Sequence, residues 1–257
     1  MIAALTELTS LASDGLLVAV FVFLRVGAAI ALLPAFGETM IPARVRLALA
    51  LAFTAVVAPS IGLSAAPTTL LSSVLAGFHE VLVGLILGLS IRVSVFVLQM
   101  AGTMAAQATS LSQLLGGQII DPQPALGAVL VLGGIALATL FDLHVRVAEM
   151  FVISYRFLPF GTAPGAGYLA EWSFALADDA FRLAFSLAMP FLLGSLLYNL
   201  ALGVINRAMP QMMVAFVGAP AITLGALVLL ALAAPLMLTV WLDFVAERLQ
   251  SPLTAGR

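Results

Sequence analysis

The stretch LLSSVLAGFHEVLVGLILGLSIRVSVFVLQM, residues 70–100, indicates what kind of protein this is. Its only ionisable side chains are His79, Glu80 and Arg92, and the rest is largely apolar. An α-helix needs about 20 mostly apolar residues to cross a bilayer. The stretch is therefore long enough to span a membrane.

The composition of the whole chain supports the same conclusion. Of 257 residues, 63% are hydrophobic and only 9% are charged. A soluble domain is about 45–50% apolar and about 25% charged. Surface area grows with chain size, so a larger core would not absorb the excess of apolar residues. We expect an integral membrane protein.

Five further apolar stretches lie on either side of the first. They cover residues 15–36, 46–63, 125–141, 180–203 and 212–240. Together the six predict an all-α integral membrane protein with about six long, partly kinked hydrophobic helices in hairpins, and we treat residues 1–257 as one membrane domain. Gly218 and Pro220 interrupt the last stretch, which predicts a kinked or discontinuous helix there.

Two residue types are missing, and their absence excludes several kinds of chemistry. The chain has no cysteine, which excludes disulfides, a thiolate nucleophile and cysteine-ligated metals. It also has no lysine, which excludes a phosphate-binding P-loop lysine and a Schiff-base lysine. The net charge of −2 and the lack of a basic stripe argue against nucleic-acid binding.

The remaining residues do not form a recognisable catalytic site. The two histidines, His79 and His144, lie on separate segments, and neither a HExxH nor a GxSxG motif is present. His79 and Glu80 are neighbours, so on a helix they point about 100° apart and do not converge on a metal. We therefore predict no enzyme activity, no catalytic residue, no metal site and no cofactor.

Charges inside the apolar stretches are costly unless they are paired or face a cavity. Asp178 and Arg182 are four residues apart and share a helix face, so they can neutralise each other. Arg25, His79 and Glu80 have no such neighbour. Their partners must lie elsewhere in the chain or on another subunit, and a proton path through His79 and Glu80 is an alternative.

Gly84 and Gly88 form a GxxxG pattern, which lets a second helix approach closely. The approaching helix would belong to this chain or to another subunit.

The segment AGTMAAQATSLSQLLGGQIIDPQP, residues 101–124, has an unusual composition. It is rich in amides, hydroxyls, glycine and leucine but contains one charge, Asp121. A solvated loop would carry more charges, and a membrane span would carry fewer polar groups. The segment is therefore an irregular loop packed against the helices or the lining of a pore, where soft Met and Leu side chains can close a gap. Asp121–Pro122 would end it.

Three motifs in this order and spacing carry a family resemblance. The first is Arg25 followed by LLPAFGETMIPARVRLALALAFTAVVAP at 32–59, which includes Pro34, Pro42, Arg44 and Arg46. The second is the long middle helix that leads to Gly102 and then to Asp121–Pro122. The third is NRAMPQMMVAFVGAPAITLGALVLL at 206–230, with Asn206, Arg207, Pro210, Gln211, Gly218 and Pro220. Over essentially its whole length the chain resembles the FliR/SctT family of type III secretion export-gate proteins.

This resemblance implies a function, a location and a set of partners. Such a protein would be a subunit of the flagellar type III export gate, in the inner membrane at the flagellar basal body. It would form and seal part of the channel for unfolded export substrates. FliP and FliQ would join it in a hetero-oligomeric pore complex among membrane lipid, with FlhB and FlhA at the base. A FliP-like part would cover 1–175 and a FliQ-like hairpin 176–257.

The resemblance also places a pore plug at about 106–122. Gly116 and Gly117 would let the plug move, while Arg25, His79 and Glu80 would pair with neighbouring subunits. The residues that would seal the idle pore are Met104, Leu111, Leu114, Leu115, Ile119 and Ile120.

Two other classes of function stay open from the sequence. A proton-coupled transporter of small molecules or ions would use His79 and Glu80 as a proton relay. Transporters usually carry paired broken helices, and this sequence offers one candidate, at Gly218–Pro220. A purely structural assembly factor is the third possibility.

Overall fold

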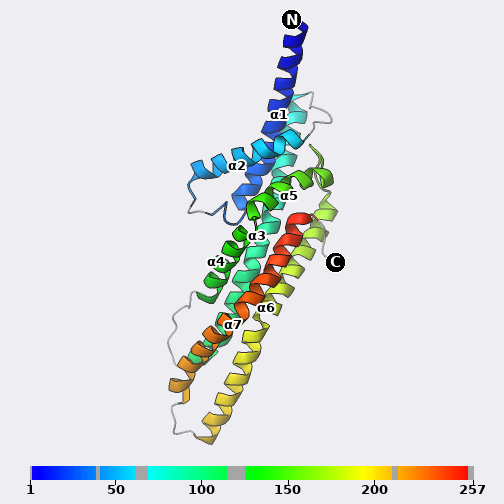
Figure 1. Cartoon of the computed structure of the whole chain (residues 1–257). Helices are drawn as coiled ribbons and strands as arrows, with labels where there is room; N and C mark the ends of the chain where they lie inside the picture. The colour runs from blue at the N-terminus through cyan, green and yellow to red at the C-terminus, as the bar shows by residue number, and fades with distance from the viewer. Residues whose placement is uncertain (1, 39–40, 62–68, 115–124, 210–213, 254–257) are drawn as a thin grey trace. The chain divides into compact units, whose positions relative to one another are not determined.

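The computed structural model describes residues 2–38, 41–61, 69–114, 125–209 and 214–253. The described part of the chain contains helices and no β-strand (Figure 1). The elements are α1 (Ile2–Leu32), α2 (Ala43–Val57), the short 3₁₀ helix η1 (Ala58–Ser60), α3 (Leu70–Leu114), α4 (Ala125–Leu140), α5 (Leu143–Phe157), α6 (Ala166–Ala208) and α7 (Val214–Gln250).

The helix lengths confirm the predicted fold class. Within the described residues, five helices are long and apolar enough to cross a membrane. The count rises to six if α4 and α5, which are bent by 74° at the short break between them, are taken as one broken span. The chain is therefore an all-α membrane protein with several long hydrophobic helices, as its composition predicts.

The helix α3 is longer than the apolar stretch that predicts it. It continues to Leu114, so the first part of the polar segment 101–124 is helical and not an irregular loop. Ala, Met, Gln and Leu in this part all favour helix. The hydroxyl of Thr103 donates a hydrogen bond to the Gln99 carbonyl at 2.7 Å, which satisfies that side chain within the helix.

Helix α5 was not predicted from the sequence. Its residues, LHVRVAEMFVISYRF, mix charges with apolar side chains and do not form a long hydrophobic run. Val147, Met150 and Phe151 are buried on one face, as in an amphipathic helix. Asp142 separates α5 from α4 by adopting a left-handed conformation with φ 57°.

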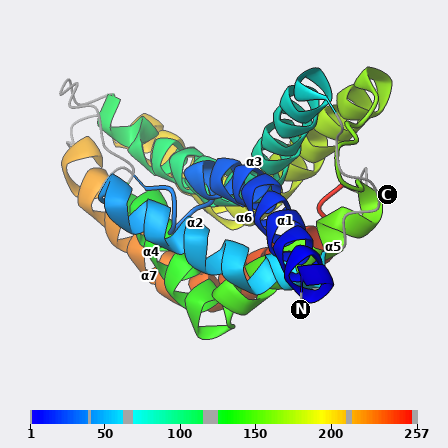
Figure 2. The same cartoon turned by 90° about the horizontal axis from the view of Figure 1, so that it is seen from above.

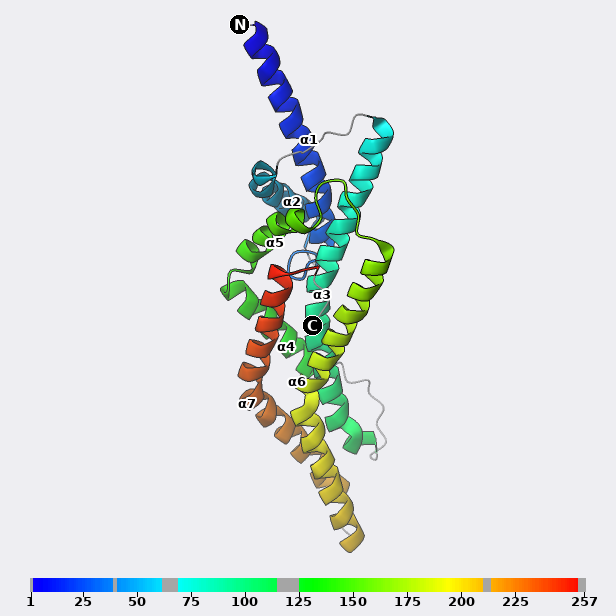
Figure 3. The ribbon, with the colours of Figure 1, turned by 90° about the vertical axis from the view of Figure 1, so that its right-hand side faces the viewer.

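The ends of the last two helices also differ from the prediction. α6 begins at Ala166, well before the start of the expected apolar stretch 180–203. α7 is continuous from Val214 through both Pro220 and Pro235. Of the two alternatives predicted at Gly218–Pro220, the discontinuous helix is therefore wrong and the kinked helix stays. Figure 3 shows that α7 changes direction along its length, as expected of a helix with internal prolines.

The helices contribute to two compact units. Unit 1 consists of Met1–Val93, Thr139–Leu176 and Val245–Arg257, and unit 2 of Ser94–Ala138 and Ala177–Phe244. The boundaries fall inside α3, α4, α6 and α7. The division into a FliP-like and a FliQ-like part stays a prediction.

In unit 1, α1 packs directly on the first half of α3. A Cβ at Gly84 would overlap the carbonyl oxygen of Arg25 and lie 2.9 Å from the Cβ of Ala28. A Cβ at Gly88 would lie 2.6 Å from the carbonyl oxygen of Ala29. The GxxxG pattern therefore serves packing inside this chain.

Helix α2 runs across α1 in the same unit, as the two views in Figures 1 and 2 show. It contacts α1 and α5. Phe53 of α2 lies between two other aromatic rings, with 5.9 Å between its ring centroid and those of Phe36 and Phe151. These edge-to-face contacts connect the turn after α1 to α5 through α2.

In unit 2, the second half of α3 packs on α4 and α7. A Cβ at Gly102 would lie 2.5 Å from the backbone nitrogen of Gly127, so the backbones of α3 and α4 nearly touch. Trp241 of α7 is buried, and its indole nitrogen Nε1 donates a hydrogen bond to the Ser94 carbonyl at 2.6 Å. These contacts hold the three helices side by side.

Candidate functional site

The most concentrated polar site in unit 1 is an ion pair between α1 and α3. Arg25 and Glu80 both have 0% exposed side chains. The guanidinium Nε lies 2.7 Å from Glu80 Oε2, and Nη2 lies 3.1 Å from Oε1. This two-point contact is the strong form of an arginine–carboxylate pair.

Helix α5 and the loop after it complete the coordination of Arg25. Its Nη1 donates a hydrogen bond to Ser154 Oγ at 3.0 Å, and Nη2 donates one to the Leu158 carbonyl at 3.1 Å. The guanidinium carbon lies 3.6 Å from the centroid of the Tyr155 ring, which adds a cation–π contact.

Glu80 receives two further donors from the same region. The Tyr155 hydroxyl donates to Oε2 at 3.0 Å, and the Gly161 backbone N–H donates to Oε1 at 3.1 Å. Both carboxylate oxygens are thus engaged by N–H and O–H donors, as a buried charge requires. Arg25, Glu80, Ser154, Tyr155, Leu158 and Gly161 are called the Arg25–Glu80 cluster below.

This cluster corrects one expectation. The partners of Arg25 and Glu80 lie within the chain, so the prediction that these two pair with neighbouring subunits is wrong. Fifty-five residues separate the two side chains, and the pair forms only when α1 packs on α3. Because the two residues lie on different helices, the spacing of residues along one helix does not predict this pair.

His79 contacts the same loop residue as Glu80, but through the carbonyl oxygen of that residue. It is half-buried, and its Nδ1 lies 2.8 Å from the carbonyl oxygen of Gly161. A carbonyl only accepts hydrogen bonds, so this contact requires a proton on Nδ1. Gly161 has a positive φ of 70°, which glycine adopts readily. A role for His79 against another subunit stays a prediction.

The first family motif follows the cluster along the chain. Pro34 is buried after the end of α1, Pro42 is exposed directly before α2, and Arg46 is half-buried on α2. Glu38 in the intervening turn accepts a 2.9 Å hydrogen bond from Arg92 of α3. This second pair was not predicted, because its members are also far apart in the sequence.

The other predicted residues divide between described and undescribed parts of the chain. Asn206 and Arg207 are exposed at the end of α6, and Met104 is half-buried on α3. Leu111 and Leu114 fall in the last turns of α3. The predicted residues outside the described part are Leu115, Gly116, Gly117, Ile119, Ile120, Asp121, Pro122, Pro210 and Gln211. The pore plug stays a prediction.

The local pair on α6 is as predicted. Arg182 Nε lies 2.7 Å from Asp178 Oδ2, and both side chains are exposed.

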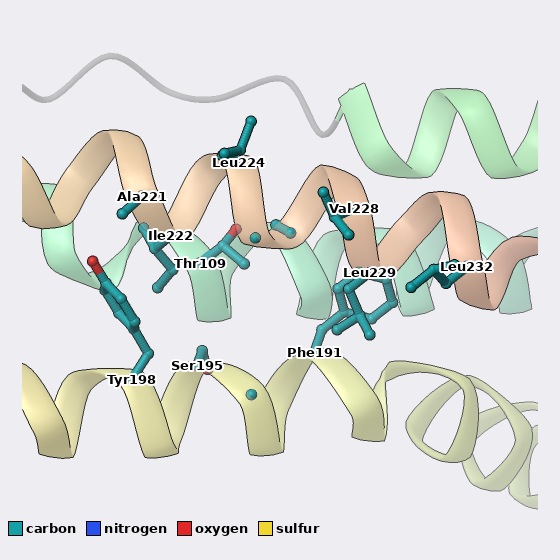
Figure 4. Close-up of a pocket in the computed structure, with 13 residues that line it drawn as sticks. Thr109, Phe191, Ser195, Tyr198, Ala221, Ile222, Leu224, Val228, Leu229 and Leu232 are labelled. Atoms are coloured by element: carbon teal, nitrogen blue, oxygen red, sulfur yellow. The ribbon is translucent and has the colours of Figure 1, made fainter.

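Unit 2 contains an apolar cavity of about 480 Å³. Figure 4 shows the side chains that α6, α7 and the C-terminal part of α3 direct toward it. At one side the Tyr198 hydroxyl donates a hydrogen bond to the Gly218 carbonyl at 2.8 Å. The lining includes Thr109, Phe191, Ser195, Ile222 and Leu229. Among the described residues no acidic or basic side chain lines it, so we assign it no catalytic role.

Comparison with known proteins identifies the family. Residues 16–247 match the family described as bacterial export proteins, family 1. The chain is 34% identical over 236 residues to the flagellar biosynthetic protein FliR of Caulobacter vibrioides, an alignment that covers 90% of this chain and 94% of that protein. It is 28% identical over 206 residues to the FliR of Escherichia coli, covering 77% and 76% of the two chains. Against the FliR of Aquifex aeolicus, identity is 30% over 209 residues, covering 79% and 80%. The chain belongs to family 1 of the bacterial export proteins.

Proposed function

We propose that this protein is a membrane subunit of the flagellar type III protein export apparatus. In this role it forms part of the channel through which unfolded export substrates cross the inner membrane. The observation that carries the proposal is the family match over residues 16–247, together with relatives that bear the name flagellar biosynthetic protein FliR.

The structure is compatible with a scaffold of this kind. Its long apolar helices suit a multi-pass protein of the inner membrane. The polar groups of the Arg25–Glu80 cluster are occupied by one another, which suits a structural role better than a proton relay. The comparisons give no support to a small-molecule or ion transporter.

The partners we propose are FliP and FliQ in one pore complex, with FlhB and FlhA at its base. Large apolar side chains on α6 and α7 support the proposal of further protein neighbours among the lipid, because they are exposed in this chain. Leu196 and Leu232 are 64% and 75% exposed. Affinity purification of the tagged protein from membranes should recover FliP and FliQ; recovery of the chain alone in mild detergent would contradict this part of the proposal.

The central experiment is deletion of the gene in its own host. Secretion of hook and filament proteins into the medium should stop, and a plasmid copy should restore it. A matched control would restore the gene with Gly225→Ala, because a Cβ at that position meets nothing within 4 Å. Normal secretion in the deletion strain would refute the export function.

The plug is the second part of the proposal, and it rests on the family resemblance. We propose that the segment at about 106–122 closes the idle channel, with Gly116 and Gly117 as its hinge. Deleting residues 114–117 should then increase ion leak across the inner membrane, measured with a membrane-potential dye. Unchanged potential in a complex that still assembles would show that the seal lies in other subunits.

A further inference from the structure

The second half of α3 carries polar side chains at a helical spacing that keeps them on one face. Gln99, Thr103 and Gln107 follow one another at intervals of four residues. Gln99 and Gln107 are exposed, and Thr103 is half-buried. These three residues are called the amide stripe. Nearer the start of the helix, Leu85 and Leu89 are exposed instead, so the exposed amides are confined to the second half of α3.

The neighbouring helices show at what depth the amide stripe lies. Ser94, just before the stripe, contacts Trp241 of α7. Gly102, within the stripe, packs on Gly127 of α4. Thr109, just after the stripe, faces the cavity that α6 and α7 line. The stripe therefore runs alongside the middle of α7 and the start of α4.

Those neighbours are uncharged throughout the same region. Neither α4 nor the part of α7 at residues 214–242 contains an Asp, Glu, Lys or Arg. Their exposed residues are mostly apolar, and they include Leu132, Leu232 and Leu236, which are 70%, 75% and 69% exposed. This pattern is typical of residues at the depth of the hydrocarbon core.

Exposed amides are unfavourable at that depth. A glutamine side chain has two N–H donors and a carbonyl acceptor, and hydrocarbon offers no hydrogen-bond partner to such groups where they are exposed. Moving an amide from water into an apolar medium without replacing its hydrogen bonds costs roughly 2–7 kcal/mol. Thr103 differs because its hydroxyl bonds to the Gln99 carbonyl of its own helix. The face that exposes the two amides therefore meets something other than lipid tails.

We propose that the amide stripe lines a water-filled passage and contacts the backbone of an unfolded polypeptide inside it. This inference rests on the proposed function. It assigns the amide stripe to the wall of the export channel. Uncharged amides exchange hydrogen bonds with water and with any peptide backbone, whatever the side chains. They carry no charge that would retain an oppositely charged segment. Such a surface suits a path for polypeptides of unrelated sequence.

The absence of cysteine makes this proposal directly testable. Single substitutions Gln99→Cys, Thr103→Cys and Gln107→Cys would be made in the full chain, within the assembled complex in cells that are exporting. A polar, membrane-impermeant maleimide reacts with a thiolate, and a thiolate forms readily in water but not in apolar surroundings. All three stripe cysteines should react with the maleimide.

Two sets of control variants place the thiol in apolar surroundings instead of water. Ala101→Cys and Ala105→Cys place the thiol on the buried face of the same helix. Leu232→Cys and Leu236→Cys place it on exposed apolar positions of α7. The stripe cysteines should react about tenfold faster than either set, because apolar surroundings, whether protein or lipid, suppress the thiolate.

A second measurement tests contact with the polypeptide itself. A cysteine placed in a stalled export substrate should form a disulfide with Gln99→Cys and with Gln107→Cys under mild oxidation. The buried control Ala105→Cys should form none. Failure of both stripe variants to cross-link, in cells where the stalled substrate occupies the complex, would overturn the proposed contact.

Stripe cysteines that react no faster than Leu232→Cys, in variants that still export, would overturn the inference. The export function itself would stand in that case, because secretion is measured in the same cells. Equal reaction at Ala101→Cys and Gln99→Cys would also overturn it, since the labelling would then not follow one face of the helix.

Discussion

Removing one half of the Arg25–Glu80 pair should destabilise the protein much more than the packing change alone. Arg25→Met preserves much of the side-chain volume but leaves Glu80 fully buried without a counter-charge. Within the cluster, the Tyr155 hydroxyl and the Gly161 N–H then remain as donors to the carboxylate. Glu80→Leu leaves the guanidinium with Ser154 and a carbonyl oxygen as its acceptors.

The magnitudes follow from the burial of both charges. Breaking a buried ion pair by removing one partner costs about 3–5 kcal/mol. Removing both partners leaves only neutral groups of the cluster without their hydrogen bonds to Arg25 and Glu80, and each such hydrogen bond contributes about 1 kcal/mol. We therefore expect Arg25→Met/Glu80→Leu to cost about 2–3 kcal/mol, much less than the sum of the single changes.

The assay is a double-mutant cycle on the free energy of unfolding, measured by denaturant titration of the purified protein in bicelles. The abundance of each variant in membranes provides a second readout. Arg182→Met is a matched control, because its partner Asp178 is exposed and no measurable change is expected. Single and double variants whose costs simply add would refute the reasoning, since the two charges would then not be coupled.

Two further changes test the packing of each unit. Gly84→Ala should cost about 1–3 kcal/mol, because the added Cβ would overlap the Arg25 carbonyl and force α1 away from α3. Gly225→Ala is the control and should be tolerated. Equal unfolding midpoints for the two variants would contradict this prediction. Trp241→Phe should cost about 1 kcal/mol through loss of the hydrogen bond to the Ser94 carbonyl. The buried-indole fluorescence should fall but persist, because Trp172 is also buried. A stability equal to that of the parent would show that the Trp241 hydrogen bond contributes nothing.

The sequence predicts the fold class because lipid imposes one simple requirement, a long apolar helix. It misses α5 because a short helix that mixes charges with apolar residues does not meet this requirement. It places the start of the polar segment at residue 101, although Ala, Gln and Met there favour helix. Helix propensity, weighed separately from hydropathy, would have extended α3.

The candidate site was only partly predictable, for a related reason. Arg25 and Glu80 stand out in the sequence as charges in apolar surroundings, and both lie in the cluster. Their pairing depends on which helices pack together, and local spacing does not contain that information. Glu38 and Arg92 show the same limit, because the turn after α1 reaches α3 only in the folded chain.

The distance along the chain between Arg25 and Glu80 has a consequence for biosynthesis. The ribosome completes α1 before it makes the residues that neutralise Arg25, and Glu80 follows 55 residues later. At about 5–20 residues per second, that interval lasts roughly 3–11 seconds. During it, an isolated arginine at the centre of a nascent helix costs about 2.5–3.5 kcal/mol to place in the bilayer. Packing of α3 on α1 removes that cost, because Glu80 then neutralises the charge.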